Sequence, residues 1–316
     1  MGDRENFGED TTADEAVDGL DLSGRRFLIT GASGGLGAEA ARALASKGAS
    51  ITLTARDLPK AEATVAAIAT ATGNDDITIE ELELGNLASI RAFAQRWNDQ
   101  HDHLDVLINN AGVMACPKDT TDDGFERQFG TNHLGHFLLT ALIAPTLLAA
   151  GPGARIVNLS SRAHHNSAVD IDDLHFERRP YDRWVAYGQS KTANVLHAVE
   201  LDRRLRDRGV RAFALHPGAI VTDLGRHLTA EDIAAYTKDR PSLKLKSVEA
   251  GAATTVYAAT APELDGQGGV YLEDCGIAEV DDESPESGVR SYAVDTDAAR
   301  RLWSVSEEHV GETADL

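Results

Sequence analysis

The segment 26-RFLITGASGGLGAEAARALASKG-48 determines the fold of this chain. Its apolar start, residues 26–30, predicts a buried strand, its glycines predict a tight turn, and the stretch from Gly35 to Lys47 predicts a helix. Strand, glycine-rich turn and helix in this order form the phosphate-binding corner of a dinucleotide fold, where the backbone approaches a pyrophosphate at the helix N-terminus. The spacing G-x-x-x-G-x-G is specific only because a strand precedes it and a helix follows it.

Short apolar runs alternate with amphipathic stretches from this corner to about residue 216, and a less regular segment then leads into a final helix and a strand around residues 269–272. Strands that alternate with longer helices are typical of a parallel sheet covered on both faces. We therefore predict an α/β, doubly wound Rossmann fold as a single domain over residues 21–316, ending in a C-terminal helix over about 291–310. Residues 1–20 are acidic and lack apolar periodicity, which predicts a disordered tail.

Composition limits the classes of function. The 316 residues include 30 Lys and Arg against 51 Asp and Glu, a formal net charge of −21, which disfavours nucleic acid and anionic membrane surfaces. Cys116 and Cys275 lie far apart without a Cys/His cluster, so we expect neither a disulfide framework nor a metal site. The apolar stretch Leu134–Ala150 contains His136 and Pro145 and predicts a buried helix, not a membrane anchor. We expect a cytoplasmic protein.

The end of the second strand bears on the choice of dinucleotide. An NAD-binding corner places an acid there to hold the ribose 2′-hydroxyl. In this chain the strand 50–55 is followed by Arg56. A guanidinium pairs well with the 2′-phosphate of NADP(H), which we favour. NAD(H) remains the alternative cofactor, because the adjacent Asp57 could accept a hydrogen bond from the ribose hydroxyl. Arg56 could also be a solvated charge at the start of a helix, with no role in cofactor binding.

Two further strand ends are expected to border the cofactor. Glu83, in 81-ELELGNL-87, ends the third strand. Its carboxylate either accepts a hydrogen bond from the adenine amino group or lies exposed to solvent. In 109-NNAG-112 the small Ala111 and Gly112 allow the backbone to approach the cofactor, although such Asn pairs also form ordinary turns.

A candidate reaction centre follows from residues on two later helices and one strand. Tyr187 and Lys191, in 187-YGQSK-191, share one face of a predicted helix. A neighbouring ammonium favours the phenolate, so the tyrosine could exchange a proton with an alcohol or carbonyl oxygen. Ser161 ends a strand and either holds that oxygen or begins a loop. Asn132 carries an amide that anchors a proton-relaying water, caps a helix or packs helices.

These motifs together make the chain resemble the short-chain dehydrogenase/reductase family over about residues 22–275. The phrases 124-GFERQFGTNHLGHFLLT-140 and 156-IVNLSSRAHH-165, and the gap of 26 positions between Ser161 and Tyr187, are similar to its retinol dehydrogenase-like group, which includes the dehydrogenase part of WW-domain oxidoreductases. The resemblance implies a seven-stranded parallel sheet in the order 3-2-1-4-5-6-7 and hydride transfer with NADP(H), or alternatively NAD(H). It also implies a catalytic tetrad: Asn132, Ser161, Tyr187 and Lys191.

The resemblance further implies which residues contact the cofactor. Tyr187 and Lys191 contribute to the cofactor site as well as to catalysis, Lys191 through the nicotinamide ribose, and Thr222 binds the carboxamide. The other expected contacts lie on loops at the strand ends: Gly31, Ser33, Gly35, Leu36, Gly37, Arg56, Glu83, Leu84, Asn110, Ala111, Gly112, Pro217, Gly218 and Ile220.

The substrate side of the site is expected from the resemblance alone. The resemblance implies an apolar carbonyl or alcohol (an aldehyde, a ketone, or a retinoid- or steroid-like compound), a flap over about 166–183 and a substrate loop over about 217–245. It also implies a homodimer through the helices that begin near Asn132 and Tyr187. A redox-responsive binding protein without turnover is the alternative, and the retained Tyr187 and Lys191 favour the enzyme.

Overall fold

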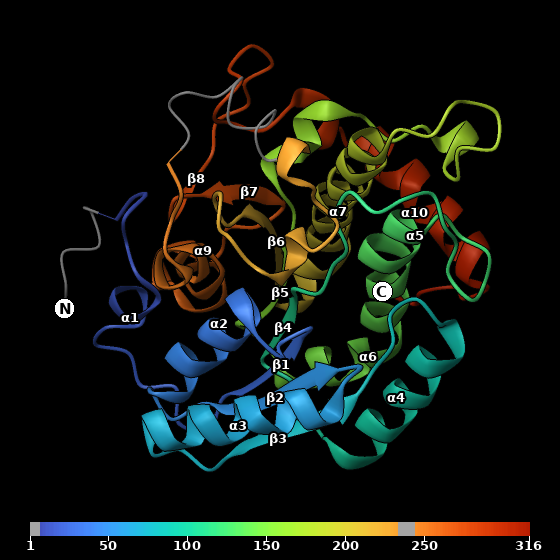
Figure 1. Ribbon diagram of the computed structural model, residues 1–316. Coiled ribbons are helices and arrows are strands. Elements are labelled where there is room, and N and C mark those ends of the chain that lie inside the picture. Colours follow the sequence, from blue (N-terminus) through green and yellow to red (C-terminus); the bar gives the residue numbers. More distant parts are fainter. Residues whose placement is uncertain (1–6, 233–243) are drawn as a thin grey trace.

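The computed structural model of the chain describes residues 7–232 and 244–316, and its strands form one sheet at the centre of the molecule (Figure 1). Seven strands run parallel in the order β3-β2-β1-β4-β5-β6-β7, which confirms the predicted order, and β8 pairs antiparallel with β7 at the edge. The bounds are β1 (Arg26–Thr30), β2 (Ser50–Ala55), β3 (Ile77–Glu81), β4 (Val106–Asn109), β5 (Ala154–Leu159), β6 (Val210–His216), β7 (Val270–Glu273) and β8 (Gly276–Ile277).

The edge strand β8 extends the sheet beyond the prediction. Asp274 and Cys275 form the turn between β7 and β8, with φ angles of 48° and 58°. Positive φ at both central residues of a two-residue hairpin matches the twist of the flanking strands. Because Cys is not among the residues that favour this conformation, the local sequence does not predict the hairpin.

Helices cover both faces of the sheet. One hydrophobic core contains Leu28 of β1 together with buried residues of α4, α6, α7 and α10, and the other contains Phe27 and Ile29 with residues of α2, α3 and α9. Consecutive β1 residues thus enter opposite cores, as strand geometry requires. The bounds are α1 (Ala13–Ala16), α2 (Gly35–Ala45), α3 (Leu58–Thr72), α4 (Leu87–Gln100), α5 (Arg127–Phe129), α6 (Gly135–Ala150), α7 (Arg183–Leu205), α9 (Val248–Thr260) and α10 (Thr296–Val310).

The predicted disordered tail is wrong for residues 7–20, and residues 1–6 lie outside the described part. Thr12 and Glu15 cap α1 reciprocally, because Thr12 Oγ1 accepts from the Glu15 N–H at 3.3 Å and Glu15 Oε2 accepts from the Thr12 N–H at 2.8 Å. This short helix packs against α9 and α2. This segment is ordered despite its acidic composition, because the apolar side chains of the helix and of its C-cap residue are fully buried: Ala13, Ala16 and Val17.

The C-terminal helix α10 packs against α7 and the beginning of the α6 region. The Trp303 ring lies 4.9 Å from the ring of Phe137, and the Arg204 guanidinium lies 4.2 Å from the Trp303 ring. Ser306 Oγ lies 2.8 Å from His133 Nε2. Part of the helix surface on which a homodimer was expected is therefore covered by the same chain.

The helical run Arg127–Ala150 is long and apolar enough to cross a membrane by length and composition, and its most apolar window of 18 residues has a mean hydropathy of 1.5. However, 67% of its most apolar window is buried inside the protein, as expected for a core helix. A π-helical turn, η2 (Gly130–Leu134), precedes α6 within this run. Such turns are frequent at functional sites, and Asn132 lies in this one.

Candidate active site

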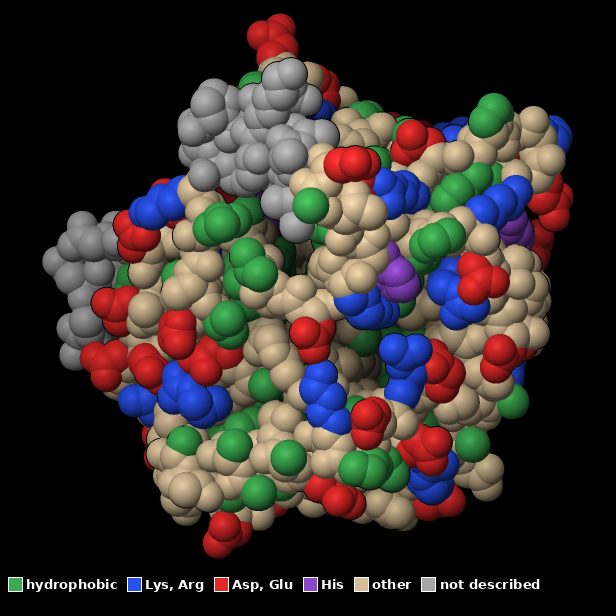
Figure 2. Space-filling view, viewed as in Figure 1, with side chains coloured by type: hydrophobic (Ala, Val, Ile, Leu, Met, Phe, Trp, Pro, Cys, Tyr) green, Lys and Arg blue, Asp and Glu red, His purple; other side chains and the backbone are tan. Residues whose placement is uncertain are grey.

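The predicted site residues gather at the carboxyl edge of the sheet. The strand order reverses between β1 and β4, and doubly wound sheets bind ligands at such a point. The face of the molecule in Figure 2 is hollowed near its centre, and both basic and acidic side chains surround the hollow.

The glycine-rich turn between β1 and α2 forms a narrow cradle. A Cβ on Gly31 would lie 2.6 Å from the Cβ of Ala111, and a Cβ on Gly37 would lie 2.6 Å from Nδ2 of Asn110. Because Gly34 precedes α2 and has no side chain to cap it, the N–H groups of the first helical turn remain for a ligand. A pyrophosphate suits such donors at a helix N-terminus, so this turn fits a dinucleotide.

Thr30 fixes the loop after β4, a role that sequence reasoning missed. Its Oγ1 accepts from the N–H groups of Asn110 and Ala111, at 3.0 Å each, and Asn110 Nδ2 donates to Thr30 O at 2.7 Å. Asn109 is buried and donates instead to Asn158 Oδ1 at 2.8 Å. Of the two adjacent asparagines, Asn110 is therefore the one that shapes the cofactor side.

Arg56 and Glu83 form an ion pair at the ends of β2 and β3. Arg56 Nη1 lies 3.3 Å from Glu83 Oε2, and the two side chains are 60% and 37% exposed. Glu83 Oε1 accepts from the Gly85 N–H at 2.8 Å, so both carboxylate oxygens have partners within the protein. Asp57 caps α3 by accepting from the Lys60 N–H at 3.1 Å. This cap gives Asp57 a structural use that requires no ribose contact.

The other predicted cofactor residues lie around the same cradle. A Cβ on Gly251 of α9 would lie 2.6 Å from Ile220 and 2.8 Å from Leu36, so both side chains pack closely against this glycine. The Thr222 side chain lies 3.6 Å from the Cβ position of Gly35. The remaining members follow β1, β3, β4 and β6, and their contact with the cofactor stays a prediction: Ser33, Leu84, Gly112, Pro217 and Gly218.

Tyr187 and Lys191 lie one turn apart on α7, each 3% exposed. Lys191 Nζ lies 5.6 Å from the centre of the Tyr187 ring and donates to Leu159 O at 2.9 Å. A Cβ on Gly112 would lie 3.7 Å from this nitrogen, so the lysine reaches the loop after β4. Burial lowers the pKa of Lys191 to about 7. The amine therefore changes its charge near neutral pH beside the phenol.

Ser161 follows β5 and caps the 3₁₀ turn η3 (Arg162–Asn166). Its Oγ accepts from the Ala163 N–H at 3.1 Å, which leaves the hydroxyl proton available to a substrate oxygen. The preceding Ser160 is buried and donates to Lys191 O at 2.8 Å. The two adjacent serines thus differ in use: Ser161 caps η3, and Ser160 bonds to the backbone of α7.

His164 holds the carbonyl of Ser161. Its Nδ1 lies 2.7 Å from Ser161 O, and its Nε2 accepts from the Arg290 N–H at 3.2 Å. Burial lowers the pKa of His164 to about 3, so the ring is neutral with its proton on Nδ1. This histidine therefore packs and orients the loop after β5.

The side-chain amide of Asn132 is used by the protein itself. Oδ1 accepts from the Val113 N–H at 2.8 Å, and Nδ2 donates to Val113 O and to Ser190 Oγ, at 2.9 Å each. Ser190 Oγ in turn donates to Tyr187 O at 2.7 Å. The amide therefore joins the loop after β4 to α7, which favours the packing alternative over an amide-anchored water.

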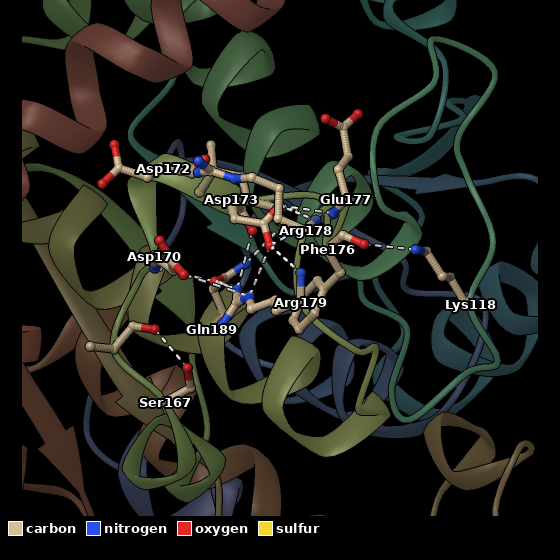
Figure 3. Close-up of polar contacts among 12 residues, drawn as sticks. Lys118, Ser167, Asp170, Asp172, Asp173, Phe176, Glu177, Arg178, Arg179 and Gln189 are labelled. Carbon is tan, nitrogen blue, oxygen red and sulfur yellow. Dashed lines mark hydrogen bonds and ion pairs between the residues drawn. The ribbon is translucent and has the colours of Figure 1, made fainter.

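The insertion 166–183 is anchored to α7 (Figure 3). Gln189 Oε1 accepts from Arg179 Nη2 at 2.5 Å and from the Asp170 N–H at 3.2 Å. Because Gln189 is two residues beyond Tyr187, its side chain lies about 200° around the helix from the tyrosine. This part of the insertion thus packs on the face opposite Tyr187, and the flap over the substrate stays a prediction.

Asp173 organises the turn of the insertion (Figure 3). Its carboxylate accepts from the backbone N–H groups of Glu177, Arg178 and Arg179, the shortest at 2.8 Å. The Arg179 guanidinium stacks 4.0 Å from the ring of Phe176. The local sequence predicts neither contact. Both contacts form only after the chain has adopted this turn, and no sequence pattern indicates the turn.

The predicted substrate loop, 217–245, links the two sides of the site, although residues 233–243 lie outside the described part. Ala219 and Leu245 pair as a parallel bridge. One ion pair joins the loop to α3 and one joins it to the start of α7: Lys60 with Asp223, at 2.8 Å, and Arg183 with Asp232.

Comparison with known proteins identifies the family that uses this arrangement. Residues 25–233 match the short chain dehydrogenase family. Retinol dehydrogenase 13 of Homo sapiens is 43% identical over 293 residues, which are 92% of this chain and 86% of that protein. The chain belongs to the short-chain dehydrogenase/reductase family. The predicted likeness to its retinol dehydrogenase group is confirmed.

Solved structures agree with this assignment. An uncharacterized protein from Mycobacterium Paratuberculosis is 36% identical with a TM-score of 0.74, over 97% of this chain and 100% of that one. A Pseudomonas aeruginosa RhlG/NADP active-site complex is 25% identical with a TM-score of 0.64, over 80% and 95%. As a member of this family, the chain is a dehydrogenase/reductase that acts on CH–OH groups.

Proposed function

We propose that this short-chain dehydrogenase/reductase is an NADP(H)-dependent oxidoreductase for apolar carbonyl or alcohol substrates, with Tyr187 as general acid/base. The observation that carries the proposal is the buried pair on α7, in which the Lys191 amine lies 5.6 Å from the Tyr187 ring. A buried cation beside a phenol favours the phenolate, which tunes the tyrosine for proton transfer at neutral pH.

Each chain residue has a defined task in this proposal. Tyr187 donates a proton to the oxygen of a carbonyl substrate or removes it from an alcohol. Ser161 donates its free hydroxyl proton to the same oxygen and holds it beside the tyrosine. The bound nicotinamide supplies or accepts the hydride. Asn132 acts as a positioning residue, because its amide connects to Tyr187 through Ser190.

The preference for NADP(H) is supported by the end of β2. The Arg56 guanidinium is 60% exposed and accessible to a 2′-phosphate, with Glu83 as its partner within the protein. Asp57 is engaged as the cap of α3, which weakens the case for NAD(H). A relative named retinol dehydrogenase 13 supports an apolar aldehyde or alcohol as the class of substrate.

The first test measures turnover. Purified protein is mixed with NADPH and a panel of apolar aldehydes and ketones that includes retinal, and the absorbance of reduced nicotinamide is followed. Tyr187→Phe is expected to lower kcat by about 10³-fold, because proton transfer is lost while the ring remains in place. Unchanged Kd for NADPH in this variant is the control. Wild-type levels of turnover in Tyr187→Phe would rule out the assigned role.

The second test measures cofactor preference. Wild-type protein is expected to bind NADPH more tightly than NADH, and Arg56→Ala is expected to weaken NADPH binding by about 10- to 100-fold, because one charge-assisted bond to the phosphate is lost. Asp57→Asn keeps an oxygen that can cap α3, so it serves as the matched control and leaves the preference unchanged. Tighter binding of NADH by the wild-type protein would contradict the NADP(H) assignment.

A further inference from the structure

A buried histidine lies between the cofactor side and the catalytic side of the site. His136, on the first turn of α6, is 2% exposed. Its Nε2 lies 2.8 Å from Thr30 Oγ1 on β1, and its Nδ1 lies 2.9 Å from Asn132 O in η2. A buried imidazole is costly unless its nitrogens are hydrogen-bonded, and here both partners belong to elements of the site.

The partners of His136 determine where its proton is. A carbonyl oxygen only accepts, so Nδ1 carries the proton and donates to Asn132 O. Nε2 is then an acceptor for the Thr30 hydroxyl, which has the Ile108 carbonyl as a longer alternative at 3.5 Å. Burial lowers the pKa of His136 to about 4, so the ring keeps this neutral form at neutral pH.

Hydrogen bonds continue on each side of the ring. On the Nε2 side, Thr30 Oγ1 accepts from the N–H groups of Asn110 and Ala111, in the loop expected to face the dinucleotide. On the Nδ1 side, Asn132 bonds through its amide to Ser190. Ser190 then donates to the carbonyl of Tyr187, so one ring connects the cofactor loop with the catalytic helix.

We propose that His136 is a positioning residue with two separable tasks in the oxidoreductase reaction, an inference that rests on the function proposed above. Its Nε2 side holds Thr30 and thereby the loop that binds the dinucleotide. Its Nδ1 side holds the backbone of Asn132 and thereby the placement of Tyr187. The first task affects cofactor binding, and the second affects proton transfer after both ligands are bound.

Two amide substitutions separate these tasks. His136→Asn places an N–H donor near the Nδ1 position, so it retains the bond to Asn132 and loses the bond to Thr30. His136→Gln places an amide near the Nε2 position and does the reverse. We expect about tenfold weaker NADPH binding with unchanged kcat for the Asn variant, and about tenfold lower kcat with unchanged Kd for the Gln variant. His136→Leu, which keeps neither bond, is expected to show both effects.

His133 supplies the matched control. It lies in the same helical run, is 1% exposed, and bonds through Nε2 to Ser306 Oγ of α10, away from the cofactor loop. His133→Leu is expected to lower Tm as His136→Leu does, while Kd and kcat stay within about twofold of wild type. Equal losses of both parameters in the two amide variants, or losses no greater than in His133→Leu, would overturn the inference. If wild-type protein binds NADPH but turns over no substrate, the proposed function fails, and the Kd values still decide whether His136 holds the dinucleotide loop.

Discussion

The two faces of α7 are stabilised in opposite ways. On one face, Lys191 is buried beside Tyr187 with a backbone carbonyl as its hydrogen-bond acceptor, and burial lowers its pKa. On the other face, Gln189 joins a network in which Arg179 forms ion pairs with Asp170 and Asp173, at 3.6 and 3.5 Å (Figure 3). Within the part of the chain that the structure describes, α7 thus has one face with an amine that no carboxylate pairs and one face that packs against the paired charges of the insertion.

The difference suits the two faces of α7 to different roles, acid/base chemistry on one and structural support on the other. Paired charges keep one protonation state and one geometry over a wide pH range, which suits a support. A buried amine without a carboxylate partner titrates near neutral pH and destabilises the folded chain, which suits an acid/base site. We infer that the insertion supports a helix whose opposite face is unfavourable for stability, and the predictions below test the two faces separately.

The largest expected effect concerns the face of α7 that carries Tyr187 and Lys191. Lys191→Met is expected to raise the free energy of unfolding at pH 7 by on the order of 4 kcal/mol, because a buried amine with a pKa of about 7, against an ordinary value of 10.5, is replaced by an apolar side chain. Leu159 O keeps a donor, Asn194 Nδ2 at 2.9 Å. Turnover is expected to be lost in the same variant, and denaturant unfolding measures the stability.

The pH dependence checks the sign of this effect. Between pH 7 and 10.5 the unfolded lysine holds its proton and the folded lysine has released it, so the unfolded state binds more protons and rising pH stabilises the wild-type fold. The advantage of Lys191→Met should therefore shrink as pH rises through this range. An advantage that is constant with pH would show that the amine does not titrate there.

The next effect tests how closely α7 approaches the strand end that carries Ser161. A Cβ on Gly188 would lie 2.6 Å from Ala163 O and 3.0 Å from Asn166 Cβ. Alanine favours a helix interior over glycine by about 1 kcal/mol, but this overlap is expected to cost about 3 kcal/mol, so Gly188→Ala destabilises by about 2 kcal/mol. We also expect kcat to fall about tenfold as Tyr187 moves relative to Ser161.

Gly276→Ala is the control for Gly188→Ala. The nearest atom to its Cβ position, Glu273 O, is at 3.7 Å, which is an ordinary contact. This substitution is expected to change neither stability nor kcat measurably. A stable and fully active Gly188→Ala protein would mean that α7 and η3 can separate without consequence.

The cofactor side of this site could be predicted from the sequence because its determinants are local. The turn from Gly31 to Gly37 follows from backbone sterics within a few residues, and parallel strand ends bring 109–112 to the same edge. Tyr187 and Lys191 follow from helical periodicity. The sequence alone therefore predicts that these residues lie at one edge of the parallel sheet.

The features that were not predicted depend on contacts between distant segments. α1 carries a Thr12-x-x-Glu15 capping signal, but its burial against α9 comes from residues more than two hundred positions away. In the sequence His136 is only a polar interruption of an apolar helix, because its partner Thr30 lies on the distant β1. The length of the insertion is visible in the sequence, whereas its anchor at Gln189 is not.

The smallest expected effect concerns the supporting face and decides whether the insertion acts on the substrate side at all. Asp173→Ala removes the acceptor of three backbone N–H groups, so we expect the insertion to open locally and to be cleaved about tenfold faster by a protease, while Kd for NADPH is unchanged. Asp172→Ala is the matched control, because this neighbouring side chain is exposed.

Kinetics then distinguishes a scaffold from a lid in the Asp173→Ala protein. If the insertion only supports α7 from the face opposite Tyr187, loosening it disturbs the placement of the tyrosine and lowers kcat modestly, by about two- to threefold, with KM for substrate unchanged. If the insertion covers the substrate after all, KM rises and kcat is retained, because binding contacts are lost without a change at the proton-transfer step. The second pattern would remove the contrast between the two faces of α7.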